Sequence, residues 1–259
     1  HHENNNIDHL ESIFAKLQRL VELWRAELFQ FAVVTVPAHQ MKNESYKEAL
    51  HLSAMKSDIE ILRFTSEPTT AAVAYRVLER TDLQEEDNFS IAVVDFGATS
   101  LSVSLMRLED GFTELDLTKR HEEIRGDSVD NMIVEYVLKK AKVRGYELTN
   151  LDLSDIRKRC VEAKHELSSS SSSSSKAVVR IELGPNGEEV VLFTRQKLEE
   201  LTSTMIKQQI PAFLDDVFQE AEDEKNIKKS SFLKSKKENI ILTGGSSKLP
   251  NFDSTIKKY

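Results

Sequence analysis

Glycine is scarce in this chain, and the position of the shortage is informative. The 259 residues include eight glycines, and none precedes Gly97, whereas an ordinary soluble protein contains about 7% glycine. The segment before Gly97 therefore has no glycine-rich loop of the kind that cradles phosphate groups. A phosphate site built from such a turn must lie in the later part of the chain.

Additional cysteines, long apolar runs and an excess of positive charge are also missing. Cys160 is the only cysteine, so an intrachain disulfide is excluded and a reducing compartment, by default the cytoplasm, is expected. No apolar run approaches the roughly 20 residues of a membrane helix, and a formal net charge of −8 disfavours binding to a nucleic-acid backbone. We expect neither a membrane nor a nucleic acid among the partners.

Several common catalytic motifs are absent as well. The seven histidines form no His-x-x-x-His pair, and one cysteine cannot build a zinc knuckle. The sequence contains neither a Gly-x-Ser-x-Gly elbow nor a Walker-type Gly-x-x-x-x-Gly-Lys loop. These absences disfavour an ordinary serine hydrolase and a P-loop nucleotidase.

The first part of the chain alternates helices and strands. Apolar residues recur at steps of three and four from Ile7 to Leu28, which predicts a helix with one buried face. The apolar run Phe31–Val36 predicts a strand buried on both faces. The further elements expected here are a helix over 42–56, a strand over 59–64 and a helix opening at Glu67-Pro68. This alternation indicates an α/β layer.

The second part begins with strands and continues with helices. Three strands are predicted over 90–96, 101–108 and 112–117, with a hairpin at Glu109–Gly111. The later elements expected are helices over 128–143 and 153–167, strands over 177–183 and 188–193 around the hairpin Gly184–Gly187, a helix over 195–222 and a strand over 239–243. Pro211 inside the long helix predicts a kink or two separate helices.

These elements indicate two lobes, residues 1–89 and 90–259. We expect the second lobe to carry an insertion of helices and strands at about 127–222. Eight consecutive serines, 168–175, interrupt it and are typical of a flexible linker, and the charged stretch 222–237 predicts a solvated loop. The last helix stops abruptly at Tyr259, which indicates that the natural chain is longer.

One segment carries residues suited to phosphate chemistry. Asp95 and Gly97 lie between two predicted strands, followed by the hydroxyl residues Thr99, Ser100 and Ser102. A strand that ends in a carboxylate, followed by a turn with N–H groups and hydroxyls, can hold phosphates and magnesium-bound water. An Asp-x-Gly turn also ends many ordinary hairpins, so this segment alone leaves both interpretations open.

Four separated segments occur in the order in which they occur in one protein family. They are Val34–Ala38, Ser66–Tyr75, Val94–Gly97 and Leu242–Pro250, with shorter matches at Arg125–Asn131, Cys160–Ser170 and Phe193–Leu201. From about residue 10 to 259 the chain resembles the ATPase domain of the 70-kilodalton heat-shock chaperones of the DnaK type, in the actin-like ATPase superfamily.

The resemblance implies an α/β fold of two ribonuclease-H-like lobes, with a partial first lobe and a second lobe that has a mixed sheet and a helical subdomain. In that family a nucleotide and Mg²⁺ lie between the lobes. The resemblance therefore assigns Glu67 and Asp95 to the carboxylates that place the metal ion, through water, and the attacking water. A helix-start acid favoured by the helix dipole is the alternative interpretation of Glu67.

The same resemblance implies the residues that contact the nucleotide. The phosphate loop would be Gly97, Ala98, Thr99 and Ser100, with Gly126 as a glycine turn near the ribose and phosphates. The adenosine would be contacted by Lys164, His165, Ser168, Gly244, Gly245, Ser246 and Lys248. A further phosphate loop and a catalytic lysine of the family would precede this chain.

The chain departs from the family pattern at positions that matter for catalysis. The family has three consecutive glycines where this chain has Gly97, Ala98 and Thr99, and a later aspartate where it has Ser102. The Cβ atoms at 98 and 99 restrict close approach of the backbone to phosphates. His165 and Lys248 stand where the family has stacking arginines, and lysine does not replace arginine in that role. The sequence therefore leaves open whether the protein is an enzyme.

We interpret the chain as the nucleotide-binding domain fragment of a divergent heat-shock chaperone with weak or no ATP hydrolysis, acting in the stress response. It would assist protein folding or regulate a partner chaperone. The expected cofactors are ATP or ADP with Mg²⁺, and the expected partners are co-chaperones, a partner chaperone and an unfolded polypeptide held by a domain outside this chain. Two alternatives stay open: an orthodox ATP-hydrolysing chaperone that is truncated here, and an actin-like filament or scaffold protein.

Overall fold

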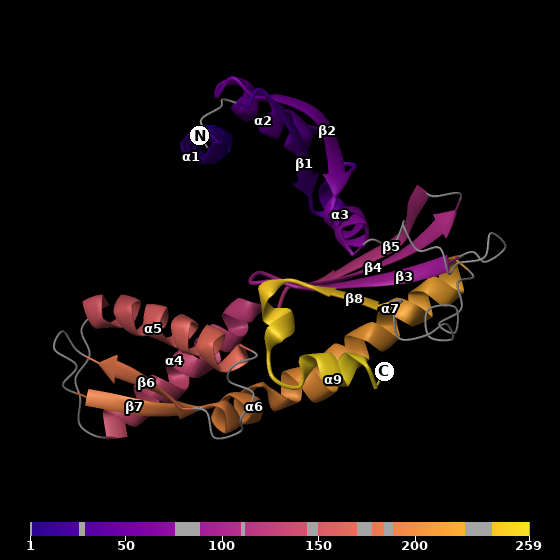
Figure 1. The fold of residues 1–259 in the computed structure, drawn as a ribbon. Helices are drawn as coiled ribbons and strands as arrows, with labels where there is room; N and C mark the ends of the chain where they lie inside the picture. Colours follow the sequence, from indigo (N-terminus) through magenta and orange to yellow (C-terminus); the bar gives the residue numbers. More distant parts are fainter. Residues whose placement is uncertain are drawn as a thin grey trace.

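The computed structural model describes residues 2–25, 29–75, 89–109, 112–143, 150–169, 178–183, 189–225 and 240–258. An N-terminal group of elements and a larger group meet at helix α3 (Figure 1). The N-terminal group comprises α1 (His2–Arg25), β1 (Phe31–Val36), the 3₁₀ turn η1 (Ala38–Gln40), α2 (Glu44–Met55), β2 (Glu60–Ser66) and α3 (Glu67–Ala74).

The N-terminal group is built on two parallel strands. β1 and β2 pair in parallel from Phe31–Glu60 to Val36–Ser66, and α2 connects them, as expected for an α/β layer. One face of the pair packs against α1 and α2 through a buried cluster of Phe14, Val36, Leu50, Ala54, Ile59 and Ile61. Because the strands are parallel, their carboxyl ends lie at the same edge, where η1 and α3 begin.

Two expectations for this group are only partly met. The prediction that the strand over 31–36 is buried on both faces is wrong, because Phe31 and Val33 are 57% and 58% exposed. The described helices cover one face of the strand pair and leave the other bare. The apolar stripe of the first helix buries Phe14, whereas Leu17 and Trp24 are exposed. Hydrophobic periodicity identified these elements, but it could not show what would cover them.

The larger group is built on a four-stranded mixed sheet with the order β5-β4-β3-β8. Its strands are β3 (Phe89–Phe96), β4 (Leu101–Glu109), β5 (Phe112–His121) and β8 (Ile240–Thr243). β4 pairs antiparallel with β3 and β5, and β8 runs parallel to β3. The structure confirms the predicted strands but extends β5 four residues beyond Leu117.

Both faces of this sheet carry buried apolar residues, and each meets a different partner. On one face Ile91 and Val93 pack with Met106, Ile241 and Ala72 of α3. The Tyr75 hydroxyl at the end of α3 also donates a hydrogen bond to the Leu242 carbonyl of β8 at 3.1 Å. Helix α3 therefore joins the N-terminal group to the sheet, and the lobe boundary at residue 89 stays a prediction.

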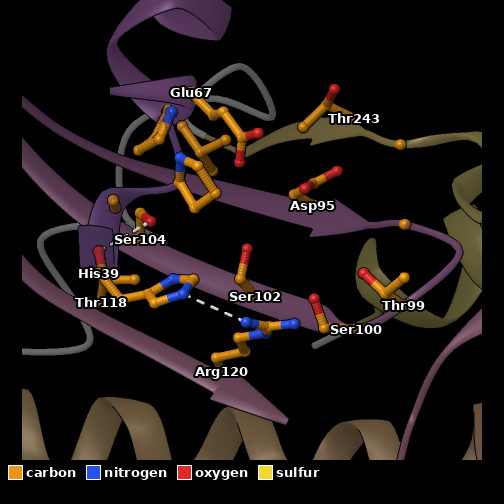
Figure 2. A pocket seen from close by; sticks show the side chains of 16 residues that line it. His39, Glu67, Asp95, Thr99, Ser100, Ser102, Ser104, Thr118, Arg120 and Thr243 are labelled. Carbon is orange, nitrogen blue, oxygen red and sulfur yellow. Dashed lines mark hydrogen bonds between the residues drawn. The ribbon is translucent and has the colours of Figure 1, made fainter. Parts of the chain in front are cut away.

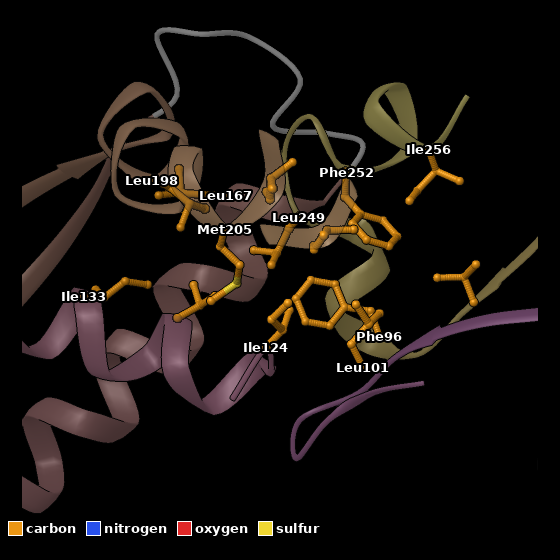
Figure 3. Close-up of a cluster of buried hydrophobic side chains, with 14 of the residues drawn as sticks. Phe96, Leu101, Ile124, Ile133, Leu167, Leu198, Met205, Leu249, Phe252 and Ile256 are labelled. Atoms are coloured by element: carbon orange, nitrogen blue, oxygen red, sulfur yellow. The ribbon is translucent and has the colours of Figure 1, made fainter. Parts of the chain in front are cut away.

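The other face of the sheet packs on the main core. Phe96 lies near Phe252 with ring centroids 5.1 Å apart, inside the cluster drawn in Figure 3. The remaining elements are α4 (Gly126–Val143), α5 (Asn150–Ser168), β6 (Val178–Leu183), β7 (Glu189–Thr194), α6 (Arg195–Thr204), α7 (Ile210–Lys225), the 3₁₀ turn η5 (Gly245–Lys248) and α9 (Phe252–Ile256).

The predicted interruption near Pro211 is confirmed. A π-helical turn, η4 (Met205–Gln209), separates α6 from α7, because Pro211 has no backbone N–H to donate in the regular helical pattern. The hairpins at Glu109–Gly111 and Gly184–Gly187, most of the serine run 168–175 and most of the charged stretch 222–237 lie outside the described residues. Among the helices that are described, none combines the length and apolar content needed to cross a bilayer.

Candidate functional site

The ends of two parallel strand pairs meet on one side of the molecule. In the N-terminal group β1 is followed by Pro37–His39 and β2 by Glu67, while in the larger group β3 ends at Phe96 and β8 at Thr243. Carboxyl ends of parallel strands are a common place for ligand sites, because the chain leaves the sheet there and exposes loop residues. The candidate site lies at this junction.

A cavity of about 360 Å³ lies at this junction (Figure 2). It contains the two predicted carboxylates together with three predicted loop residues, Gly97, Thr99 and Ser100. The other lining residues are Pro37, Ala38, His39, Pro68, Val93, Ser102, Ser104, Thr118, Arg120, Thr243 and Gly244. We call it the carboxylate cavity.

Strand register explains which sheet residues reach the carboxylate cavity. Asp95 pairs with Thr243 of β8 on one side and with Ser102 of β4 on the other, and Ser102 pairs with Arg120 of β5. Paired residues in neighbouring strands project from the same face of a sheet. Thr243, Asp95, Ser102 and Arg120 therefore form one polar row across four strands.

Glu67 reaches the same cavity from α3. Ser66 caps this helix by accepting a hydrogen bond from the Thr69 N–H at 3.2 Å, which places Glu67 in the first turn next to Pro68. Burial raises the pKa of Glu67, and the nearby charge of Asp95 raises it further. Burial also raises the pKa of Asp95. The two carboxylates thus line one cavity that suits a cation.

Arg120 and His39 are two cavity residues that the sequence interpretation missed. Arg120 Nη1 lies 3.2 Å from His39 Nε2 and links β5 to η1. Burial and the charge of Arg120 lower the pKa of His39, with Glu122 acting in the opposite direction. The apolar pattern ends at Leu117, so the predicted strand stopped before Arg120; the alternation of Thr118 and Arg120 was the only local signal.

A second cavity of about 1050 Å³ contains six of the seven residues expected to contact adenosine: Lys164, His165, Ser168, Gly245, Ser246 and Lys248. Gly244, the seventh, lines the carboxylate cavity instead, whereas Ala98 of the expected phosphate loop lines this second cavity. The remaining lining residues are Ser169, Arg195, Ser247, Leu249, Pro250, Asn251, Asp253 and Ser254. α5 supplies one wall and the η5–α9 segment supplies the other. We call it the hydroxyl-lined cavity.

Two cations that line the hydroxyl-lined cavity, Lys164 and Arg195, have partners within the protein. The buried Lys164 ammonium lies 2.8 Å from the Asp130 carboxylate and donates to the Gly126 carbonyl at 3.2 Å. Arg195 donates to the Leu167 carbonyl at 2.7 Å. Lys164 therefore ties α5 to the start of α4 as well as lining the cavity.

Two turns divide the cavities and contribute to both. Gly97 lines the carboxylate cavity while Ala98 lines the hydroxyl-lined cavity, and Gly244 and Gly245 divide in the same way. Gly126 lies behind this divide, where its N–H donates to the Gly97 carbonyl at 3.0 Å. A ligand with a charged end and a neutral end can therefore span the two turns.

Gly244 is required by both conformation and space. Its φ is +83°, with a ψ of 147° that essentially only glycine adopts. A Cβ there would overlap the Phe96 backbone and lie 2.5 Å from the Asp95 carboxylate. At Gly245 a Cβ would meet no atom within 4 Å. Only Gly244 of this pair brings a strand end against a site carboxylate.

Comparison with known proteins places the chain in a family. The family model described as Hsp70 protein matches residues 8–259. The chain belongs to the Hsp70 family. It is 32% identical over 251 residues to the "Heat shock cognate HSP70 protein" of Trypanosoma brucei brucei. The matched region covers 95% of this chain and 34% of that protein. The chain thus spans about a third of the length of this curated relative.

Family membership confirms the fold expected from the sequence. The mixed α/β arrangement is the actin-like ATPase fold of the Hsp70 family, and members of this family bind a nucleotide with Mg²⁺. The donors in the carboxylate cavity are hard oxygen atoms, from Glu67, Asp95, Thr243, Ser100 and Ser102. Mg²⁺ typically keeps several waters and takes one or two carboxylates. The cavity fits that pattern.

Three or more His, Cys, Asp or Glu side chains never converge within the part of the Hsp70 chain that is described. Among those residues the carboxylate cavity offers two acidic side chains, Glu67 and Asp95. Two carboxylates are enough to hold Mg²⁺ through its waters when phosphate oxygens complete the shell.

Proposed function

We propose that this chain is the nucleotide-binding part of an Hsp70-type chaperone that binds ATP or ADP with Mg²⁺ and hydrolyses ATP weakly or not at all. The convergence of Glu67 and Asp95 in one cavity, beside the hydroxyl-lined cavity, carries the proposal. The phosphates would occupy the carboxylate cavity, and the adenosine would occupy the hydroxyl-lined cavity.

Glu67 and Asp95 would hold water around the metal ion and orient the terminal phosphate. The ion, when bound, neutralises phosphate charge. Ionised carboxylates accept hydrogen bonds from metal-bound water, and the charge of Asp95 adds to the larger effect of burial in raising the pKa of Glu67. A divalent cation between them would relieve this repulsion, which makes metal and nucleotide binding mutually supportive.

The adenosine would lie against α5 and η5. His165 and Ser168 from α5 and Lys248 from η5 offer hydrogen-bonding groups and line the cavity. Lys164 would contribute through the atoms that its pair with Asp130 leaves accessible, since its side chain is only 8% exposed. Gly245 and Ser246 would form the floor beneath the base and sugar.

Three features of the phosphate turn support weak hydrolysis. Ala98 and Thr99 project side chains from an exposed part of the turn, which limits backbone approach to a phosphate. The Gly97 N–H donates to the Ser100 carbonyl at 3.0 Å and is engaged within the turn. Ser102 lies between Asp95 and Arg120 in the polar row, where a hydroxyl adds neither negative charge nor a base.

The proposal extends from this chain to the function of the whole protein. We infer a cytoplasmic chaperone that assists protein folding or regulates a partner chaperone. Its partners would be co-chaperones or a partner chaperone, and an unfolded polypeptide that binds a domain outside this chain. An orthodox hydrolytic cycle is the second candidate, favoured by the presence of both carboxylates in one cavity. Membership in the Hsp70 family disfavours the actin-like filament alternative.

Calorimetry and single-turnover kinetics on the full-length protein test the proposal. We expect Mg-ATP to bind and hydrolysis to stay near the uncatalysed rate. Asp95→Asn should weaken the Mg²⁺-dependent part of binding, whereas Asp216→Asn, on the exposed surface of α7, should leave binding unchanged. Fast hydrolysis abolished by Asp95→Asn would establish the orthodox candidate, and a complete lack of nucleotide binding would refute both.

A further inference from the structure

A positive charge lies inside the carboxylate cavity. Among the described residues that line this cavity, Arg120 is the only one that carries an ammonium or guanidinium group. It lies at the end of the polar row opposite Asp95 (Figure 2). Resemblance to the family did not assign this residue, because none of the matching segments includes it.

The register sets the separation between this cation and the carboxylate. Asp95 and Arg120 are two strands apart, with Ser102 between them, so their backbones are about 10 Å apart across the sheet. Ser102 has a short side chain and does not fill the interval. The row therefore presents an anion, a gap and a cation in line on one face of the sheet.

The Arg120 guanidinium is held in place without being neutralised by close pairing. Arginine can only donate hydrogen bonds, so His39 Nε2 accepts from Arg120 Nη1 at 3.2 Å and the proton of neutral His39 must be on Nδ1. Glu122 Oε1 is 3.9 Å away, and its side chain is 76% exposed. A loose, solvated pair of this kind contributes little, and most of the five N–H donors can serve a ligand.

The cavity needs such a cation if it is to hold phosphates. Glu67 and Asp95 alone would repel a polyphosphate. The charge of Arg120 lowers the pKa of Glu67, although burial and Asp95 raise it by more. The guanidinium thus already interacts with a site carboxylate through the cavity. A planar guanidinium also matches two oxygens of a phosphate group.

We propose that Arg120 is a phosphate-binding residue of this site. Its guanidinium contacts the terminal phosphate of the bound nucleotide, opposite Glu67 and Asp95, and supplies part of the positive charge that Mg²⁺ would otherwise supply. The inference rests on the proposed nucleotide site. It adds a specificity for phosphorylated ligands to that site.

Calorimetric titration of the full-length protein with ATP and with adenosine tests the inference. Arg120→Gln should weaken ATP binding by about 10- to 100-fold, the usual size of a lost charge-assisted hydrogen bond, and change adenosine binding by less than about 2-fold. Arg120→Lys should recover part of the loss. The matched control is Arg63→Gln, an exposed arginine on β2 whose removal should leave both affinities unchanged.

A second variant separates phosphate binding from a structural link between β5 and η1. His39→Ala removes the hydrogen bond to Arg120 but leaves the guanidinium, and we expect less than about 3-fold loss of ATP affinity. If His39→Ala and Arg120→Gln weaken ATP binding equally, Arg120 acts through the link and the inference is wrong. Equal losses for ATP and adenosine in Arg120→Gln would refute it as well.

Magnesium dependence supplies an independent readout. Because Arg120 and Mg²⁺ would neutralise the same phosphates, chelating the metal should weaken ATP binding more in Arg120→Gln than in the wild type. An identical effect in both proteins would contradict the inference. If the wild type binds neither ATP nor ADP, the proposed function fails; if it binds both and Arg120→Gln binds them equally well, only the role of Arg120 fails.

Discussion

The two cavities on either side of the Gly97–Ala98 turn differ in whether their charged side chains are paired within the protein. In the carboxylate cavity, burial raises the pKa of both Glu67 and Asp95, the charge of Asp95 raises that of Glu67 further, and no ion pair among the described residues neutralises either. In the hydroxyl-lined cavity the buried ammonium of Lys164 lies 2.8 Å from Asp130. One cavity leaves charges for a ligand, and the other uses its buried charges to hold the fold.

This difference matches the two ends of a nucleotide. Phosphates and Mg²⁺ are charged and need counter-charges that the protein has not already paired. A nucleoside is neutral, and a wall of hydroxyls, backbone groups and small side chains can bind it while buried charges behind the wall stay paired. Variants that change one cavity should therefore affect stability and binding differently from variants that change the other.

The largest expected effect comes from breaking the buried pair of the hydroxyl-lined cavity. Lys164→Met leaves Asp130 buried without its cation and should lower the free energy of unfolding by about 3–5 kcal/mol. Urea unfolding followed by circular dichroism measures it. Lys158→Met, on the exposed surface of the same helix, should stay within about 0.5 kcal/mol of the wild type. Similar losses in the two variants would show that the Lys164–Asp130 pair contributes no more to stability than an exposed lysine does.

An intermediate effect is expected where the turns divide the cavities. Gly244→Ala forces a Cβ into the Phe96 backbone at a positive φ and should cost about 2–4 kcal/mol. The neighbouring Gly245→Ala places its Cβ in open space and should cost less than about 0.5 kcal/mol. Thermal unfolding of both variants provides the comparison. Equal costs would mean that the family's glycine pair acts as a unit.

The smallest expected effect concerns the unpaired charge of the carboxylate cavity. A carboxylate whose folded-state pKa is raised destabilises the folded state when ionised, and this cost disappears as the pH falls below the unfolded-state pKa. Asp95→Asn should therefore be slightly more stable than the wild type at pH 7, by less than about 1 kcal/mol because solvent reaches the open cavity.

Urea unfolding of Asp95→Asn at several pH values checks this sign. The advantage over the wild type should shrink as the pH falls through the raised pKa of Asp95 toward about 4. Asp216→Asn on the exposed surface should show no such pH-dependent advantage. A variant that is less stable than the wild type at pH 7 would mean that Asp95 is stabilised in its ionised form.

Local patterns were sufficient for most elements of the fold. The strands over 90–96 and 101–108, the helices over 128–143 and 153–167, and the break near Pro211 could be predicted because apolar periodicity and proline chemistry depend on neighbouring residues. The end of β5 could not be predicted, because Thr118–His121 are polar on both faces and only pairing with Leu101–Ser104 extends the strand.

The candidate site, like the fold, could be predicted from the sequence only in part. Motif resemblance selected Glu67, Asp95 and the residues around the turns, and the structure brings these residues to two adjoining cavities. No pattern connected Arg120 to Asp95, since strand register across β3, β4 and β5 puts them in one row. No pattern paired Lys164 with Asp130 either, because these residues lie on two helices and are 34 residues apart in the sequence.

The sequence by itself determined the element types and the Hsp70-like motifs and selected the two candidate carboxylates, because each depends on residues close together in the chain. The tertiary structure alone decided which charges are neutralised and which remain for a ligand. That outcome depends on distances and burial between residues far apart in sequence. Asp95 lies on a strand and Asp130 on a helix, and only Asp130 has a buried lysine beside it. Asp130 is therefore structural, whereas Asp95 remains available for the site.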